Sequence, residues 1–436
     1  MKVINNDKQK LLRNSKPGEI KPGLERISEL LSRLDNPQEK MKIIQISGTN
    51  GKGSTGAYIS SILAESGFRV GWFCSPSIKK QWDCIRIIGE ENDDYDNYLN
   101  IINYIVMDMR KDGLEDPSVF EVQTALAYLY FYKKSVDVAV IETGLGGTYD
   151  ATNVTRNNLL SIITPIDMDH MSFLGDDIYE IAAHKAGIIK KGSVVVTGEE
   201  NVDFAGEVFK TVCGKQSARL DTVFKKDIKL MRADTKGIEF SYRDKVYSSS
   251  FIGRHQAKNA ALAIEASLCL KRFYPDDFKQ IEFDSIAKGI SVAKLDARCE
   301  ILHDNPLIMY DGAHNPHGVA ALNKVIGDIF FERDVYAICG VFKDKNYREM
   351  LENIKDSVHR FVAVDVPGER GLDAEELLDA WMEINHAAKP SRVMRDVKEA
   401  VSLCAYRIRQ NNPSAVIVVF GSLSLYQEVL AVIDEI

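Results

Sequence analysis

The stretch KIIQISGTNGKGST, residues 42–55, has the features of a phosphate-binding loop between a strand and a helix. The apolar run at 43–46 predicts a short buried strand, and the apolar residues at 57–64 recur at helical spacing. In such a loop the backbone N–H groups face an anion, Lys52 adds a positive charge, and a hydroxyl group can bind Mg²⁺. We therefore predict that nucleotide phosphates bind to Thr49, Asn50, Gly51, Lys52, Gly53, Ser54 and Thr55.

The spacing of this loop departs from the common G-x-x-x-x-G-K-[ST] pattern, because Gly53 separates Lys52 from Ser54. The alternative is an ordinary glycine-rich turn that binds no ligand. The lysine, the hydroxyl groups and the flanking strand and helix together favour nucleotide binding.

The composition limits the class of protein. A chain of 436 residues is long for one domain and predicts two or three. Its net charge of −8 argues against nucleic-acid binding through bulk charge. The seven cysteines form no CxxC pair, which argues against a disulfide scaffold or a structural zinc site. The sequence has no signal region and no run of transmembrane length, so we expect a cytoplasmic protein without a membrane partner.

Two further predicted strands end in candidate metal ligands. The apolar run VDVAVIE (136–142) is typical of a central parallel strand and delivers Glu142 just ahead of a second glycine-rich loop. A Mg-nucleotide site needs an acid in this place, although the glycines alone could form only a turn. The strand predicted at 69–74 is followed by Ser75, at the strand end where α/β folds bind ligands.

The middle of the chain contains weaker candidates. The strand predicted at 159–166 is followed by DMDH (167–170), which is either a metal site or a capping acid with a surface histidine. A helix predicted at 176–189 carries Lys185. Residues 200–250 are polar and predict a β-rich insertion. The sequence GRHQAKN (253–259) precedes an alanine-rich helix whose N-terminus either faces a ligand or is simply capped.

Strands and helices alternate regularly in the last third of the chain, so we expect one domain at 1–296 and another at 297–436. This alternation predicts a doubly wound α/β domain with a mostly parallel sheet. The first and last of its strands end in the polar sequences YDGAHNPHG and FGSLS, at the edge where ligands bind. A metal site at His314 and His317 is disfavoured because no nearby third ligand completes it.

Eleven motifs along the chain resemble, in their order, those of one family. They are SGTNGKGS (47–54), SP (75–76), FEVQTALAYLYF (120–131), ETGLGGTYDATNV (142–154), DHMSFLG (169–175), HKAGIIKKG (184–192), GRHQAKNAALA (253–263), AR (297–298), DGAHNPHG (311–318), FKDKN (342–346) and GSLSL (421–425). Together they resemble the folylpolyglutamate synthases and bifunctional dihydrofolate synthase/folylpolyglutamate synthases of the Mur-ligase superfamily. The resemblance implies a P-loop ATP-binding domain followed by a smaller Rossmann-like C-terminal domain.

The resemblance also implies roles for single residues. It assigns the ATP phosphates to the loop with Lys52 and Ser54, and it implies two Mg²⁺ sites, with a monovalent cation left open. Lys185 matches a lysine that the family carbamylates, which turns an ammonium into a carboxylate able to bind metal. The implied metal ligands are Ser75, Glu142, His170 and Lys185; the implied nucleotide contacts in the second half are Asn259, Arg298 and Asp311; the implied glutamate contacts are His314 and Ser422. The residues implied in catalysis are Lys52, Lys185, Asp311 and His314.

The reaction that the resemblance implies is ATP-dependent formation of an amide bond. A substrate carboxylate attacks the γ-phosphate of ATP, and the amino group of L-glutamate then displaces phosphate from the acyl phosphate. Positive charge at the loop offsets the repulsion between carboxylate and triphosphate. The implied acceptor is folate or dihydropteroate, and we expect a monomer.

Three departures from the family pattern make the ligase chemistry a firmer expectation than the folate acceptor. QWDC (81–84) replaces a stretch that normally ends in arginine, in a loop associated with the pterin side of the substrate. Ser77 replaces a histidine or phenylalanine, and Thr148 stands where the family usually has an arginine or sometimes an acid. One alternative is therefore another Mur-type ligase with a non-folate carboxylate acceptor, such as a cell-wall precursor. The other is a catalytically silent ATP-binding protein. An oxidoreductase is disfavoured because the GLGG sequence (144–147) lacks G-x-G-x-x-G spacing.

Overall fold

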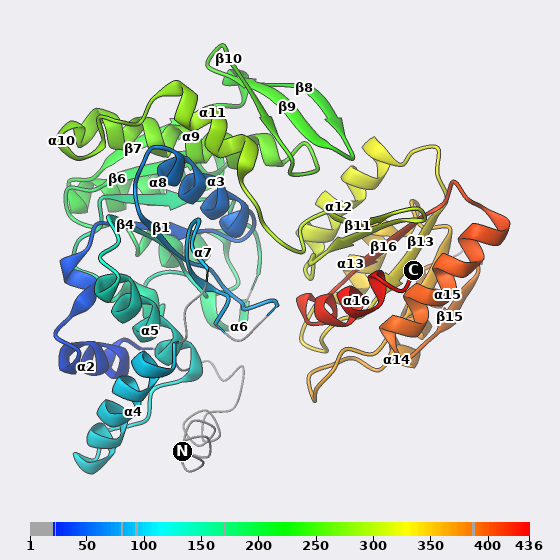
Figure 1. The fold of residues 1–436 in the computed structure, drawn as a ribbon, viewed down its shortest axis with the longest axis horizontal. Helices are drawn as coiled ribbons and strands as arrows, with labels where there is room; N and C mark the ends of the chain where they lie inside the picture. The colour runs from blue at the N-terminus through cyan, green and yellow to red at the C-terminus, as the bar shows by residue number, and fades with distance from the viewer. Residues whose placement is uncertain (1–20, 22, 80–81, 92–94, 170, 386–388) are drawn as a thin grey trace. The chain divides into compact units, whose positions relative to one another are not determined.

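The computed structural model describes the chain except for residues 1–20, 22, 80–81, 92–94, 170 and 386–388. It divides into two compact units (Figure 1). The first comprises Met1–Asp227 and Lys258–Ala293, and the second comprises Ile228–Ala257 and Lys294–Ile436. Both are built around a largely parallel sheet, so the predicted α/β fold class is confirmed.

A seven-stranded sheet in the order β3-β2-β4-β1-β5-β6-β7 forms the centre of the first unit. Neighbouring strands are parallel except for β2 and β3. The central strands are buried along their whole length, which explains their unbroken apolar sequences. The strands are β1 (Ile43–Ser47), β2 (Val70–Phe73), β3 (Ile85–Ile87), β4 (Val138–Glu142), β5 (Leu160–Ile163), β6 (Val194–Gly198) and β7 (Arg219–Val223).

Helices connect and cover these strands. They are α2 (Glu25–Arg33), α3 (Lys52–Glu65), α4 (Asp96–Lys111), α5 (Val119–Lys133), α6 (Met171–Leu174), α7 (Ile178–Ala186), α8 (Glu199–Gln216), α9 (Gln256–Phe273), α10 (Pro275–Phe278) and α11 (Phe283–Val292), with short 3₁₀ turns η1 (Pro37–Lys40), η2 (Ala151–Val154) and η3 (Lys225–Asp227). Helix α3 packs tightly on α11 at Gly289. A Cβ on this glycine would lie only 2.4 Å from the Cα of Ile62, so the close approach requires glycine. This packing fixes the helix that follows the phosphate-binding loop.

The second unit contains a six-stranded sheet in the order β11-β12-β16-β13-β14-β15 and a small antiparallel sheet, β10-β9-β8. In the larger sheet only β11 is antiparallel. The strands are β8 (Ile228–Asp234), β9 (Gly237–Tyr242), β10 (Lys245–Ser249), β11 (Glu300–Asp304), β12 (Leu307–Asp311), β13 (Val335–Cys339), β14 (Arg360–Ala363), β15 (Ser391–Val393) and β16 (Val416–Phe420). The helices are α12 (Pro316–Ile329), α13 (Tyr347–Ile354), α14 (Ala374–Ile384), α15 (Val397–Asn411) and α16 (Tyr426–Ile433), with 3₁₀ turn η4 (Leu423–Leu425).

The two faces of the larger sheet are covered by different helices. Alternate strand residues such as Val335, Ala337 and Cys339 belong to one core together with α12, α13 and α14. Helix α15 contacts β13 and β16, and it packs beside α16 on the opposite face. This is the doubly wound arrangement predicted from the alternation of strands and helices.

The prediction for residues 200–250 is wrong in its first part. Residues 199–216 form helix α8, and only the later part forms the three-stranded sheet. The buried residues Ala205, Phe209 and Cys213 recur every fourth position, which is a helical stripe. Its polar composition masked this periodicity.

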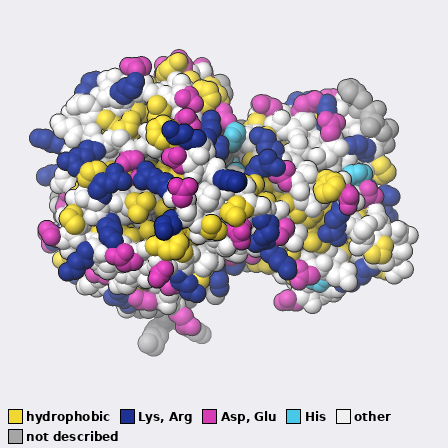
Figure 2. Space-filling view, turned by 90° about the horizontal axis from the view of Figure 1, so that it is seen from above, with side chains coloured by type: hydrophobic (Ala, Val, Ile, Leu, Met, Phe, Trp, Pro, Cys, Tyr) yellow, Lys and Arg dark blue, Asp and Glu magenta, His cyan; other side chains and the backbone are white. Residues whose placement is uncertain are grey.

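Charged side chains of both signs are interspersed over the face seen in Figure 2, together with scattered apolar side chains. No described helix combines the length and the apolar character needed to cross a bilayer. The observation agrees with the absence of an extended apolar run in the sequence.

Candidate active site

The strand order of the first unit brings the predicted site residues to one edge of its sheet. In the order β2-β4-β1-β5 the strands are parallel, so their carboxyl ends lie together. Ser75 follows β2, Glu142 ends β4, and the loop with Lys52 follows β1. The pairing of Ile46 with Glu142 places Glu142 beside the end of β1, just ahead of that loop. Parallel pairing alone therefore assembles residues that are far apart in sequence.

Glycines let the phosphate-binding loop fold closely against its neighbours. Gly48 has φ of +148°, and a Cβ there would lie 1.9 Å from Oγ1 of Thr164. Gly51 has φ of +87° and precedes α3, and its Cβ would lie 2.5 Å from Oδ1 of Asn259. Two of the three loop glycines are thus required by left-handed backbone or close approach. The contact also brings the predicted nucleotide residue Asn259 to the loop.

Two lysines meet at the first residue of this loop. Lys52 Nζ donates to the carbonyls of Gly48 and Thr49 at 3.1 and 3.2 Å. Lys185 Nζ, from α7, donates to the carbonyl of Gly48 at 2.8 Å. Burial, and then the charge of Lys52, lower the pKa of Lys185 to about 7. A buried amine that loses its proton near neutral pH is available as a nucleophile.

The segment after β5 is joined to the loop by hydrogen bonds. The backbone N–H of Thr49 donates to the carbonyl of Pro165, and its hydroxyl donates to the carbonyl of Asp167 at 3.0 Å. The charge of Asp169 acts on Lys185 in the opposite direction to burial and raises its pKa. His170, the predicted second metal ligand, lies outside the described residues.

The second glycine-rich loop holds the helix that carries Lys185. Thr148 donates from its backbone N–H, at 2.8 Å, and from its hydroxyl, at 3.1 Å, to the carbonyl of His184. Gly147 is needed here, because a Cβ would lie 2.5 Å from the same carbonyl. The Asp150 carboxylate is buried and accepts from the N–H groups of Leu145 and Thr152. The sequence reasoning missed this supporting role of Thr148 and Asp150, although both lie within a quoted motif.

In the second unit the predicted residues gather around the ends of β12 and β16. The Asp311 carboxylate accepts from the N–H groups of Cys299 at 2.7 Å and Ala313 at 2.8 Å. A Cβ on Gly312 would lie 3.1 Å from Nη1 of Arg298. The Arg298 guanidinium therefore lies against the backbone at Gly312. His314 Nδ1 lies 2.8 Å from the Gly312 carbonyl.

Ser422, the other predicted glutamate contact, follows β16, the neighbour of β12. It is buried, and its hydroxyl accepts from the N–H of Ser424 at 3.2 Å. Tyr310 donates its hydroxyl to the Ser422 carbonyl. The pairing of Asp311 with Phe420 brings the two strand ends together, so Arg298, Asp311, His314 and Ser422 belong to one edge of this sheet. Sequence reasoning missed Cys299, the neighbour that anchors Asp311.

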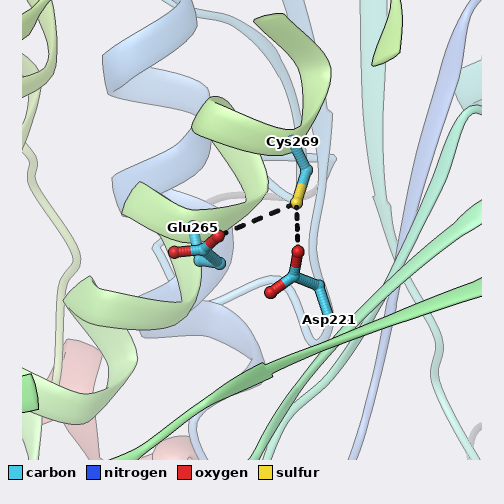
Figure 3. A group of neighbouring side chains, drawn as sticks. All are labelled: Asp221, Glu265 and Cys269. Carbon is cyan, nitrogen blue, oxygen red and sulfur yellow. Dashed lines mark hydrogen bonds between the residues drawn. The ribbon is translucent and has the colours of Figure 1, made fainter. Parts of the chain in front are cut away.

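A separate group of potential metal ligands lies away from these residues. Asp221 on β7 and Glu265 and Cys269 on α9 converge, with Cys269 Sγ 3.5 Å from an Asp221 oxygen and 3.9 Å from a Glu265 oxygen (Figure 3). Burial raises the pKa of the Cys269 thiol, which keeps it protonated and able to donate. Arg272 supplies positive charge to both carboxylates, at 3.1 and 3.5 Å. The two carboxylates are thus satisfied by the Cys269 thiol and the Arg272 guanidinium, and we interpret this group as a structural network.

A glycine substitution tests the loop geometry. We expect Gly51→Ala to weaken ATP binding by at least about tenfold, because the methyl group displaces Asn259 or the loop. Gly67→Ala is the matched control: Gly67 has φ of +89° with no atom within 4 Å of the added Cβ. Both variants should lose roughly 1–2 kcal/mol of stability from the left-handed backbone, but only Gly51→Ala should change the Kd for ATP measured by calorimetry. Equal ATP affinities in the two variants would contradict the close approach.

The lowered pKa of Lys185 predicts a pH-dependent contribution to stability. From its folded value of about 7 up to its ordinary value of 10.5, the unfolded chain holds a proton that the folded chain has released. Stability therefore rises with pH across this window. In CO₂-free buffer, the free energy of unfolding of the wild type minus that of Lys185→Met should rise by up to about 1.4 kcal/mol per pH unit. This difference is measured by urea unfolding at a series of pH values, with tryptophan fluorescence as the signal. A pH-independent difference would show that Lys185 is not buried as a neutral amine.

Comparison with known proteins agrees with this geometry. The Mur ligase middle-domain model matches residues 46–267, and the Mur ligase glutamate ligase domain model matches residues 297–423. A dihydrofolate synthase/folylpolyglutamate synthase of Bacillus subtilis is 35% identical over 375 residues, covering 83% of this chain and 85% of the relative. The chain belongs to the Mur ligase family, with the folylpolyglutamate and dihydrofolate synthases as relatives.

Solved structures extend the similarity over the whole chain. A folylpolyglutamate synthase of Mycobacterium tuberculosis complexed with ADP has a TM-score of 0.86 at 27% identity, covering 99% of this chain and 98% of that one. FolC of E. coli in complex with DHPP and ADP has a TM-score of 0.83 at 25% identity, with coverage of 99% and 98%. The family assignment made from the sequence motifs is confirmed, and with it the prediction of an ATP-dependent ligase.

Proposed function

We propose that the protein joins L-glutamate by an amide bond to a folate-type carboxylate at the expense of ATP. The observation that carries the proposal is the convergence of Lys52, Lys185 and Glu142 at one sheet edge, with the Nζ atoms of both lysines on the Gly48 carbonyl. A binding protein would have no need of a buried lysine with a pKa near 7 beside a phosphate-binding loop.

The nucleotide is proposed to bind at the start of α3. Residues 49–55 supply backbone N–H groups, the hydroxyls of Ser54 and Thr55, and the positive charge of Lys52. Asn259 borders the same loop. Arg298 and Asp311 are the proposed nucleotide contacts of the second unit, where Asp311 is held by backbone donors. Preorganised donors of this kind stabilise charge that develops during phosphoryl transfer.

The residues of the first unit suit Mg²⁺. Ser75 offers a hydroxyl and Glu142 a buried carboxylate, which are the hard oxygen ligands that Mg²⁺ prefers. A bound Mg²⁺ would supply neutralisation of phosphate charge. A second Mg²⁺ is proposed at His170 and Lys185, and a monovalent cation is left open.

Lys185 fits a cation site only after chemical change, because an ammonium repels metal ions. We propose that its neutral amine adds to CO₂, forming an N–C bond, releasing one proton and leaving a carbamate. The low pKa supports this step, since about half of the amine is neutral near pH 7. Thr148 keeps α7 in place by holding the His184 carbonyl.

The proposed reaction proceeds in two displacements. The acceptor carboxylate attacks the γ-phosphate, giving an acyl phosphate and ADP, while Lys52 stabilises the transferred charge. The amino group of L-glutamate then attacks the acyl carbon and releases phosphate. His314 and Ser422 are proposed to position glutamate in the second unit, where Asp311 also acts. Domains at 1–296 and 297–436, a monomeric state and a cytoplasmic location complete the proposal.

The acceptor is tested by phosphate release from ATP with L-glutamate present. Dihydropteroate, tetrahydrofolate and no acceptor are compared. We expect phosphate release that depends on one or both pterin compounds. The rate with dihydropteroate measures the dihydrofolate synthase activity, and the rate with tetrahydrofolate measures the folylpolyglutamate synthase activity. Release with neither, from a protein that still binds Mg-ATP, would indicate a different acceptor carboxylate. The altered loop from Ser77 to Cys84 would then be the first place to look.

A further inference from the structure

A cavity of about 120 Å³ lies in the second unit between α15 and the amino ends of β13, β14 and β15. Three of its lining residues are arginines: Arg360 begins β14, Arg392 lies in β15, and Arg407 lies on α15. Strand register pairs Arg360 with Tyr336 and Arg392 with Val362. Both arginines therefore come from the sheet face that α15 covers.

These guanidinium groups lack acidic partners among the residues that the structure describes. The cavity lining contains neither aspartate nor glutamate. No carboxylate forms an ion pair or hydrogen bond with Arg360, Arg392 or Arg407 in the described part of the chain. Arg360 lies over the ring of Tyr336, 5.3 Å from its centroid. The nearby Asp334 instead contacts His359 at 3.4 Å and the amide of Asn412 at 2.7 Å.

Two other arginines of this unit, Arg395 and Arg348, do have acidic partners. Arg395, which follows β15, contacts Asp365, Asp373 and Glu375. Arg348 pairs with Glu383. Three positive charges that line one cavity without such partners repel one another, and repulsion between like charges is stronger beside protein than in water. An anion in the cavity would relieve this repulsion.

A buried thiol, Cys404, lies among the three arginines. Cys404 lines the cavity and is 5% exposed. Burial raises the pKa of its thiol to about 11, while Arg392, Arg407 and Arg360 act in the opposite direction. Arg392 and Arg407 are half-buried and Arg360 is exposed, so the first two are the arginines nearest the interior of the cavity.

We propose that this cavity binds a phosphoryl group, as free orthophosphate or as the phosphate of a small monoester. Guanidinium groups bind tetrahedral oxyanions through paired N–H donors and are weakly hydrated, so they desolvate readily. Tyr336 also lines the cavity and offers a hydroxyl group, whereas the Ser391 hydroxyl donates to the Met382 sulfur at 3.1 Å. The volume is far below the roughly 300–1,000 Å³ of pockets that enclose drug-sized ligands, so a nucleotide does not fit inside.

The site is distinct from the residues proposed for catalysis. Asp311 ends β12 and Ser422 follows β16, whereas the cavity lies at the amino ends of the neighbouring parallel strands. The two places are opposite edges of the same sheet. The anion site is therefore independent of the proposed ligase activity, and failure of one proposal would leave the other unaffected.

Equilibrium dialysis with radiolabelled orthophosphate tests the proposal on the full chain, with saturating Mg-ADP to fill the nucleotide site. We expect the double variant Arg392→Gln, Arg407→Gln either to bind one phosphate fewer per chain than the wild type or to bind phosphate at least tenfold more weakly. Lys398→Gln is the matched control, because it removes one exposed positive charge from the same helix. Equal phosphate binding in the wild type and the double variant would overturn the proposal.

Competition separates the two sources of the phosphoryl group. Displacement of labelled phosphate by glycerol 3-phosphate would assign the site to monoesters, and failure to displace it would assign the site to orthophosphate. Equally strong displacement by succinate at the same ionic strength would overturn the phosphoryl assignment.

Arginine modification by phenylglyoxal gives a second measurement that needs no variant. Orthophosphate should slow the modification of Arg392 and Arg407 at least threefold, mapped by peptide mass, and leave Arg348 unchanged. Equal rates with and without phosphate would contradict the site even if the double variant did not fold.

Discussion

Lys52→Ala is expected to lower kcat/KM for ATP by roughly 10²–10³-fold, the usual effect of removing one preorganised charge from a transition state. Lys52 is the first residue of α3 and is held over the loop by the carbonyls of Gly48 and Thr49. Removing it leaves the backbone donors of the loop in place. The loss should therefore appear mainly in kcat, with a smaller change in the Kd for ADP.

Steady-state phosphate release and calorimetric ADP binding measure the two effects of Lys52→Ala. Lys42→Ala is the control, because Lys42 precedes β1 and pairs with the exposed Asp277 at 2.6 Å. That variant should keep wild-type kinetics, since exposed ion pairs contribute little. A Lys52→Ala enzyme with unchanged kcat would remove Lys52 from the catalytic residues.

Lys185→Met is expected to have the second large effect, a fall in kcat of at least roughly 10²-fold. Substitutions of metal ligands, and of the residues that hydrogen-bond to them, have effects of about this size. The variant loses both the hydrogen bond to the Gly48 carbonyl and the proposed carbamate. Methionine fills the buried space with an apolar chain, so the fold should persist. Unchanged kcat would exclude Lys185 from the chemistry.

A control lysine and a CO₂ experiment separate the two roles of Lys185. Lys190 is also partly buried, its pKa is lowered to about 8 by burial, and its Nζ donates to the Asn153 carbonyl at 3.3 Å. Lys190→Gln should keep most of the activity. Removing CO₂ and bicarbonate should reversibly inactivate the wild type and Lys190→Gln. Activity that is indifferent to CO₂ would leave Lys185 as a structural amine and reject the carbamate.

Local patterns in the sequence determined most of the fold. The loop at 47–54 and the alternation of elements after residue 300 depend on contacts between near neighbours, such as a glycine-rich turn, a helical stripe or a buried strand. These patterns survive without knowledge of the tertiary structure, and they placed β1, β4, β12 and β16 correctly. Helix α8 was missed because its apolar stripe of Ala205, Phe209 and Cys213 is narrow and surrounded by polar residues.

Tertiary structure alone decided which residues meet. Nothing in the local sequence indicates that Lys185 reaches the Gly48 carbonyl, that Asn259 borders Gly51, or that Cys299 anchors Asp311. Those contacts follow from the order of parallel strands, which is set by the packing of whole elements. The cavity with Arg360, Arg392 and Arg407 is the same case: three arginines that look like ordinary surface charge in the sequence share one space only because β14, β15 and α15 pack together.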